Sequence, residues 1–190
     1  ILIIGDGKRG DIDSTSAKYA SAMFDYWGFD VVTVNAFAGL DGIEPFLKYD
    51  DKGVFVWCKS SNKSGVEIQD VDLSNSSGKF FHHLAKKSVE WDFNSNLGLV
   101  VGATFPEELK EVRLLAPNVP ILLPGVGSQH GDLSLSVNYG FNGDFDSMLI
   151  SSSRSIIFAS SDMNSFGESA RKACDDLRIQ INDILSVDIN

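Results

Sequence analysis

Short apolar segments alternate along the chain with longer segments in which apolar residues recur at helical spacing. Several of the short segments are rich in β-branched residues and continuously apolar, as is typical of buried parallel strands. We predict strands at Ile1–Gly5, Asp30–Asn35, Gly53–Cys58, Leu97–Ala103, Pro120–Leu123 and Ser147–Ser151. We predict helices at Ser14–Trp27, Ile43–Tyr49, Gly78–Trp91, Pro106–Leu115, Leu133–Tyr139 and Met163–Leu185.

This alternation indicates an α/β fold with six strand–helix units. A (β/α)8 barrel takes about 250 residues, or about 31 per unit, so 190 residues correspond to about six units. Ile1 already lies in a predicted strand. We therefore expect a single domain, residues 1–190, that is a TIM barrel lacking its first two strand–helix units. An open doubly wound sheet of six parallel strands fits the length and periodicity equally well.

The composition argues against several kinds of binding partner. Asp and Glu number 26 against 16 Lys and Arg, a formal net charge of −10, which argues against nucleic acid or an anionic membrane. No apolar run approaches the roughly 20 residues of a membrane helix, and no leader is visible. Cys58 and Cys174 stand at no metal-type spacing from the histidines, so we expect neither a disulfide nor a metal site. These features favour a cytoplasmic protein.

Candidate chemistry follows the first predicted strand. Strand side chains alternate, so Asp6 and Lys8 face the same way and can form an ion pair that keeps the amine charged. Asp11 and Thr15 are four residues apart and share a helix face if the helix has already begun. Alternatively, Asp11 or Asp13 caps the helix and the Asp6–Lys8 pair is an ordinary surface pair.

The pattern Asp6-x-Lys8-x-x-Asp11-Ile12-x-x-Thr15 resembles the signature of the orotidine 5′-monophosphate decarboxylases, in its context the second bacterial and parasite-type subgroup. A lone D-x-K-x-x-D motif is weak, but the similarity extends in order through most of the chain. It continues at Thr33–Asn35, Glu44–Leu47, Cys58–Asn62, Gly98–Thr104, Pro124–Gln129 and Ser152–Arg154. The resemblance implies a TIM barrel.

The resemblance also implies a reaction: decarboxylation of orotidine 5′-monophosphate to uridine 5′-monophosphate in pyrimidine biosynthesis, without metal or organic cofactor. Lys8 would then stabilise the carbanion at C6 of the pyrimidine and protonate it. Asp6 and Asp11 would keep Lys8 in place and charged. Family members are homodimers, so Asp11 and Thr15 would act in the neighbouring subunit's site.

By the same resemblance, further residues would bind the nucleotide. Ser61 would contact the pyrimidine edge, and Gln129, Ser153 and Arg154 would hold the phosphate. The remaining candidates for substrate binding are Ile12, Thr15 and Pro124. From the residues alone, Arg154 reads as a solvated charge at the start of a helix, and Ser61 as a turn residue.

Two other functions stay open at this point. The D-x-K-x-x-D motif also occurs in magnesium-dependent sugar-phosphate decarboxylases and aldolases, and a truncated barrel could bind nucleotide without catalysis. The family also uses an Asp and a Lys from the first two barrel strands, which have no counterpart in these 190 residues.

We expect purely structural roles for several conspicuous residues. His82 and His83 fall inside a predicted helix with no acidic residue at ligand spacing. Cys58 reads as a core thiol, and Trp27 and Trp57 read as packing residues.

Overall fold

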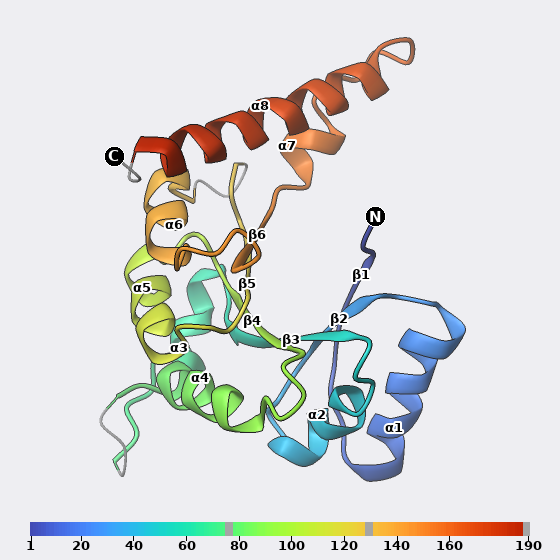
Figure 1. The fold of residues 1–190 in the computed structure, drawn as a ribbon, viewed down its shortest axis with the longest axis vertical. Helices are drawn as coiled ribbons and strands as arrows, with labels where there is room; N and C mark the ends of the chain where they lie inside the picture. Colours follow the sequence, from blue (N-terminus) through green and yellow to red (C-terminus); the bar gives the residue numbers. More distant parts are fainter. Residues whose placement is uncertain (75–77, 128–130, 188–190) are drawn as a thin grey trace.

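The computed structural model describes residues 1–74, 78–127 and 131–187 and contains six parallel strands (Figure 1). They are β1 (Ile4–Arg9), β2 (Val31–Val34), β3 (Gly53–Lys59), β4 (Leu97–Val101), β5 (Ile121–Pro124) and β6 (Met148–Ser151). Each strand pairs with its sequence neighbours, in the order β1 to β6. A doubly wound sheet would reverse its strand order at a switch point. The expected partial TIM barrel is therefore confirmed, and the open doubly wound alternative is wrong.

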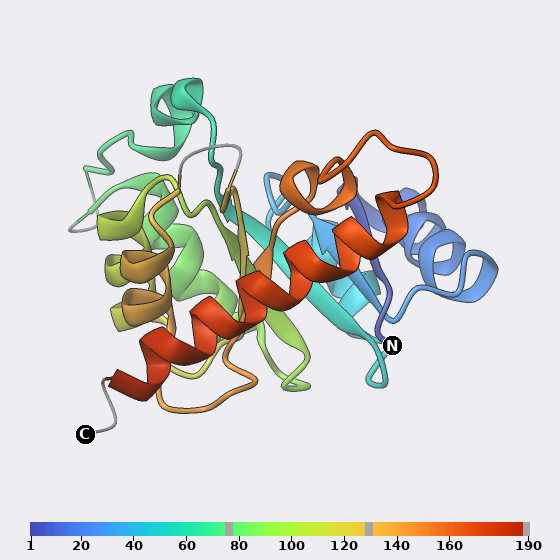
Figure 2. The same ribbon diagram turned by 90° about the horizontal axis from the view of Figure 1, so that it is seen from above.

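Helices cover the outer face of this arc of strands (Figure 1). The longer ones are α1 (Asp13–Ser21), α2 (Leu40–Leu47), α4 (Phe80–Trp91), α5 (Pro106–Leu115), α6 (Leu133–Gly140) and α8 (Phe166–Val187). The short ones are the π-helical turn η1 (Ala22–Tyr26), the 3-10 turn η2 (Lys63–Gly65), α3 (Val66–Gln69) and α7 (Arg154–Ile157). Helix α8 crosses the end of the arc and packs on α6 and α7 (Figure 2). Within the described ranges, no helix is long and apolar enough to cross a membrane.

The hydrophobic core lies between the strands and this outer layer of helices. Because successive strand residues face opposite sides, Val32 and Val34 of β2 are fully buried in the core with Phe46 of α2, whereas Thr33 between them faces inward. The same alternation on the other strands leaves one set of side chains for the inner face. The sheet thus separates a packing surface from a surface available for chemistry.

Arg113 of α5 ties together the loops at the amino ends of the last strands. Its buried guanidinium donates hydrogen bonds of 2.8–3.2 Å to main-chain carbonyls. The acceptors belong to Gly140, Ala116, Pro117, Val119 and Ser147. Burial lowers the pKa of Arg113 to about 10, so the side chain is charged at neutral pH.

The predicted boundaries differ most at β1. Residues 1–3 are apolar but exposed, because no neighbouring strand or helix covers them, and the strand instead runs from Ile4 through the polar residues to Arg9. The predicted helix Ser14–Trp27 begins at Asp13 and changes to π-helical hydrogen bonding at Ala22. Gly28 ends it with φ 71°, as expected for a helix-terminating glycine.

Candidate functional site

A cavity of about 640 Å³ opens on the inner face of the sheet, at the carboxyl ends of the strands. Side chains two residues apart on the same strand line it, as strand geometry requires. These are Ile4, Asp6 and Lys8 of β1, Trp57 and Lys59 of β3, and Leu122 and Pro124 of β5. The loops after β3 and β6 complete the wall with residues 60–62 and 151–153. Enzymes with barrel folds carry their chemistry at this end.

Asp6 and Lys8 form the ion pair expected from their spacing. Lys8 Nζ lies 2.6 Å from Asp6 Oδ1, and Thr33 Oγ1 donates a second hydrogen bond to the same oxygen at 2.7 Å. Burial raises the pKa of the Asp6 carboxyl, but the hydrogen bonds from Lys8 and Thr33 and the charge of Lys8 outweigh it and leave that pKa below its usual value. Asp6 is therefore a carboxylate at neutral pH.

The Lys8 amine sits at the mouth of the cavity. Its side chain is 35% exposed, and Nζ lies 5.8 Å from the centre of the Trp57 ring. The Lys8 backbone has φ 44°, a conformation that favours glycine and is uncommon for other residues. The chain thus presents a cation at the carboxyl end of β1, held by one carboxylate and beside an aromatic face.

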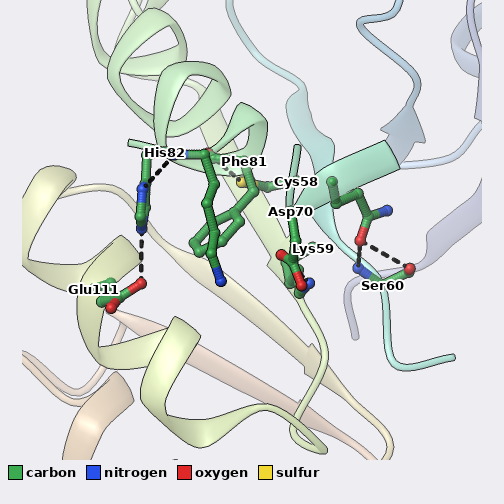
Figure 3. Close-up of polar contacts among 9 residues, drawn as sticks. Cys58, Lys59, Ser60, Asp70, Phe81, His82 and Glu111 are labelled. Carbon is green, nitrogen blue, oxygen red and sulfur yellow. Dashed lines mark hydrogen bonds and ion pairs between the residues drawn. The ribbon is translucent and has the colours of Figure 1, made fainter. Parts of the chain in front are cut away.

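The segment that carries Ser61 is anchored at both ends (Figure 3). Lys59, fully buried, lies with its Nζ 2.6 Å from Asp70 Oδ1 and over the ring of Phe105 at 4.7 Å. Gln69 Oε1 accepts hydrogen bonds from both the amide and the hydroxyl of Ser60, each at 3.0 Å. These contacts close residues 60–70 into a compact loop over the end of β3.

The turn that follows the neighbouring strand β4 fixes the main chain of Ser61. Thr104 Oγ1 donates to the Ser61 carbonyl at 2.9 Å. A Cβ at Gly102 would lie 2.6 Å from the Ser61 Cα, so the close approach of the two segments requires glycine there. Ser61 also lines the cavity.

Pro124 and Ser153 line the cavity at the ends of β5 and β6. Ser152 Oγ donates to the Val126 carbonyl at 3.3 Å, which joins the two loops. Arg154 is exposed at the start of α7 and does not line the cavity itself, although it directly follows Ser153. Gln129 lies outside the described residues. Of the expected phosphate-binding residues that the structure describes, Ser153 therefore lines the cavity and Arg154 does not.

Asp11, Ile12 and Thr15 do not line this cavity. Asp11 and Thr15 would share a helix face only if the helix began before Asp11, and this condition is not met, because α1 begins at Asp13 and Ile12 is extended with φ −118° and ψ 155°. Asp11 Oδ1 instead accepts a hydrogen bond from the Ile12 amide at 2.8 Å. The alternative helix-cap role fails too, since the N-cap position is Ile12 and has no side-chain cap. The Ile12 and Thr15 side chains are exposed.

His82 has an acidic partner in space, although none stands at ligand spacing along the sequence. His82 lies in the first turn of α4, where its Nδ1 accepts from the Lys79 amide at 3.0 Å and its Nε2 lies 2.7 Å from Glu111 of α5 (Figure 3). The pair joins two outer helices, so its role is structural. Among the described residues, no group of three His, Cys, Asp or Glu side chains could hold a metal ion.

Sequence reasoning missed other residues of the cavity. Trp57 lines it beside Lys8, and Lys59, Ser60 and Asn62 line it next to Ser61. Trp57 and Lys59 face inward because of the register of β3 in the sheet, which the local pattern of apolar and polar residues does not reveal. Trp27, expected to pack, is 66% exposed, whereas Cys58 is buried as expected.

Comparison with known proteins places the chain in a family. A family model described as "Orotidine 5′-phosphate decarboxylase / HUMPS family" matches residues 1–167. An orotidine 5′-phosphate decarboxylase from Paracidovorax citrulli is 43% identical over 185 residues, which cover 96% of this chain and 67% of the relative. Another from Aromatoleum aromaticum is 41% identical over 180 residues, covering 95% of this chain and 66% of the relative.

Solved structures agree as well. The OMP decarboxylase of Leishmania donovani superposes with a TM-score of 0.83 at 34% identity, over 97% of this chain and 68% of that one. The UMP synthase of the same organism gives 0.83 at 35% identity, over 94% of this chain and 39% of the longer protein. The chain thus spans about two thirds of the length of its curated relatives.

Proposed function

This chain belongs to the orotidine 5′-phosphate decarboxylase / HUMPS family, and we propose that the protein decarboxylates orotidine 5′-monophosphate to uridine 5′-monophosphate in pyrimidine biosynthesis. The observation that carries this proposal is the Asp6–Lys8 pair of 2.6 Å at the mouth of a cavity large enough for a ligand. Relatives named orotidine 5′-phosphate decarboxylase share about 40% of the sequence, and the solved Leishmania donovani OMP decarboxylase shares the fold.

Lys8 is the group proposed to act on the reacting carbon. The bond from C6 of the pyrimidine to its carboxyl carbon breaks, carbon dioxide leaves, and the electron pair stays on C6. The ammonium of Lys8 stabilises this negative charge as it develops and then gives its proton to C6. The neutral amine afterwards regains a proton from solvent. The ion pair with Asp6 holds the amine in position before the reaction.

The remaining candidates are assigned to substrate binding. Ser61 is proposed to hydrogen-bond the pyrimidine edge, and its anchored loop supports a fixed position. Ser153, Arg154 and Gln129 are proposed to hold the phosphate, with Pro124 beside them. A guanidinium that follows directly on a cavity-lining residue can present a fork of donors to an anion.

We also propose that the protein is a homodimer in which each subunit completes its partner's site. Asp11, Ile12 and Thr15 follow Lys8 closely in sequence but do not line the cavity of their own chain. Ile12 is 55% exposed and Phe37, which follows the adjacent strand β2, is 82% exposed, so apolar side chains are available for contact with a second subunit. Asp11 would add a second carboxylate to the partner's Lys8, with Ile12 and Thr15 contacting its substrate.

The cytoplasm is the proposed location. Cys58 is buried as a free thiol and Cys174 is a free thiol on the surface, which fits a reducing compartment.

Replacement of Lys8 by Ala in the full-length protein tests the activity. We expect turnover of orotidine 5′-monophosphate to be lost while uridine 5′-monophosphate still binds, because the phosphate and ring contacts are separate from the amine. Full turnover by K8A would refute the assignment. Turnover that instead requires magnesium and ignores uridine nucleotides would favour a sugar-phosphate decarboxylase or aldolase, and nucleotide binding without turnover in the unmodified protein would favour a non-catalytic barrel.

A further inference from the structure

The pairing of β1 with β2 is irregular beside the Asp6–Lys8 pair. Gly5 pairs with Val32, but the next paired residue of β1 is Arg9, which pairs with Val34. Three residues of β1, Asp6 to Lys8, therefore stand opposite the single residue Thr33. Such a bulge turns side chains in new directions and leaves main-chain groups without their usual partner across the ladder.

The Thr33 hydroxyl fills the gap that this bulge creates. It accepts a hydrogen bond from the Lys8 main-chain amide at 3.0 Å, and it donates one to Asp6 Oδ1 at 2.7 Å. Thr33 is only 1% exposed, so water does not compete freely for these bonds. One side chain of β2 thus contacts both members of the ion pair.

This double contact bears on the direction of the Lys8 side chain. The Lys8 backbone has φ 44°, which lysine seldom adopts, and the hydrogen bond to its amide holds this conformation in place. The same Asp6 oxygen receives both Thr33 Oγ1 and Lys8 Nζ, so the position of the carboxylate, and with it that of the amine, depends on the hydroxyl.

We propose that Thr33 is a positioning residue for decarboxylation, which holds Lys8 and Asp6 in the geometry that the reaction needs; this inference rests on the proposed function. Only a hydroxyl can accept from an amide and donate to a carboxylate at once within this space. Valine has the same shape but neither capacity, whereas serine retains both. The proposed role therefore depends on the hydroxyl of Thr33 and not on the size of the side chain alone.

The test compares three variants of the full-length protein: Thr33→Val, Thr33→Ser and Val32→Ala. Val32 is the adjacent residue on β2 and faces the core, so V32A weakens the same strand from its other side. Steady-state rates with orotidine 5′-monophosphate are measured across pH, together with thermal unfolding.

We expect T33V to lower kcat by about ten- to a hundredfold, the effect of losing a hydrogen bond to a charged group. The acid limb of its pH–activity profile should also move to higher pH, because loss of the hydrogen bond from Thr33 raises the pKa of Asp6.

T33S should retain most of kcat and the pH profile of the unmodified protein. V32A should lower the melting temperature but leave kcat and the pH profile unchanged. A T33V enzyme with unchanged kcat and pH profile would overturn the proposal, as would a V32A enzyme that reproduced the T33V profile. If T33V does not fold, Thr33→Ala against T33S makes the same comparison. Full turnover by K8A would instead refute the proposed function itself, so the two failures are distinguishable.

Discussion

Lys59 and Asp70 form an ion pair of 2.6 Å in which the lysine is fully buried, and this pair joins the end of β3 to the residue after α3. The carboxylate is the partner that neutralises the buried ammonium. The loop between them carries Ser61, so the pair links the stability of the protein to the shape of its cavity.

Asp70→Asn should destabilise the protein by about 3–5 kcal/mol, because it leaves a buried charge without its counter-charge. The double change Lys59→Met with Asp70→Leu should recover much of this loss, since the surrounding rings of Phe81 and Phe105 accept apolar groups. Urea unfolding measures both. Asp72→Asn, at an exposed carboxylate two residues away, is the matched control and should change the free energy of unfolding little. An equal effect of D70N and D72N would contradict the prediction.

Mixed subunits test the shared site. If Asp11 acts in the partner's site, K8A and Asp11→Asn proteins are each inactive alone, but a heterodimer of the two contains one site with both Lys8 and Asp11 intact. After unfolding and refolding together in equal amounts, random pairing should restore about a quarter of the unmodified activity. Absence of recovery, with dimers shown by sedimentation, would mean that Asp11 serves its own chain.

Asp6 should contribute to the acid dependence of stability. Its pKa in the folded protein lies below the usual value of 3.8, so its contribution is present above that value and is lost as the pH falls through the folded pKa. Asp6→Asn should flatten this part of the curve. Urea midpoints taken from about pH 6 down to about pH 3 measure the effect, and identical slopes for the two proteins would contradict it.

Arg113→Lys should destabilise the protein by about 2–4 kcal/mol although it keeps the charge. The lysine has no planar fork and cannot reach the carbonyls that Arg113 joins, which leaves several of them unpaired. Arg178→Lys, on the exposed α8, is the control and should be nearly neutral. Unfolding free energies that match between the two variants would argue against the role assigned to Arg113.

The sequence predicted the order of strands and helices well, because that order follows from apolar periodicity. Helix α5 matches its predicted range from Pro106 to Leu115, since a proline at the first position and a regular apolar stripe define it. The short helices α3 and α7 were missed, as four residues are too few to show a period.

The site was predictable where it depends on local spacing. The Asp6–Lys8 pair follows from strand alternation, and it is present. The contacts of Thr33 could not be foreseen, because they arise from a shift of register between β1 and β2 that depends on the whole sheet. The partners Asp70 of Lys59 and Glu111 of His82 are likewise set by how loops and helices pack.

The alternation of side chains along β2 has a consequence for how such a protein can diversify. Val32 and Val34 are constrained by packing in the hydrophobic core, whereas Thr33 between them is constrained by its proposed role in the reaction. Neighbouring codons are thus under separate selective demands. A library that randomises only inward-facing positions could explore new substrates while the outer layer preserves a foldable scaffold.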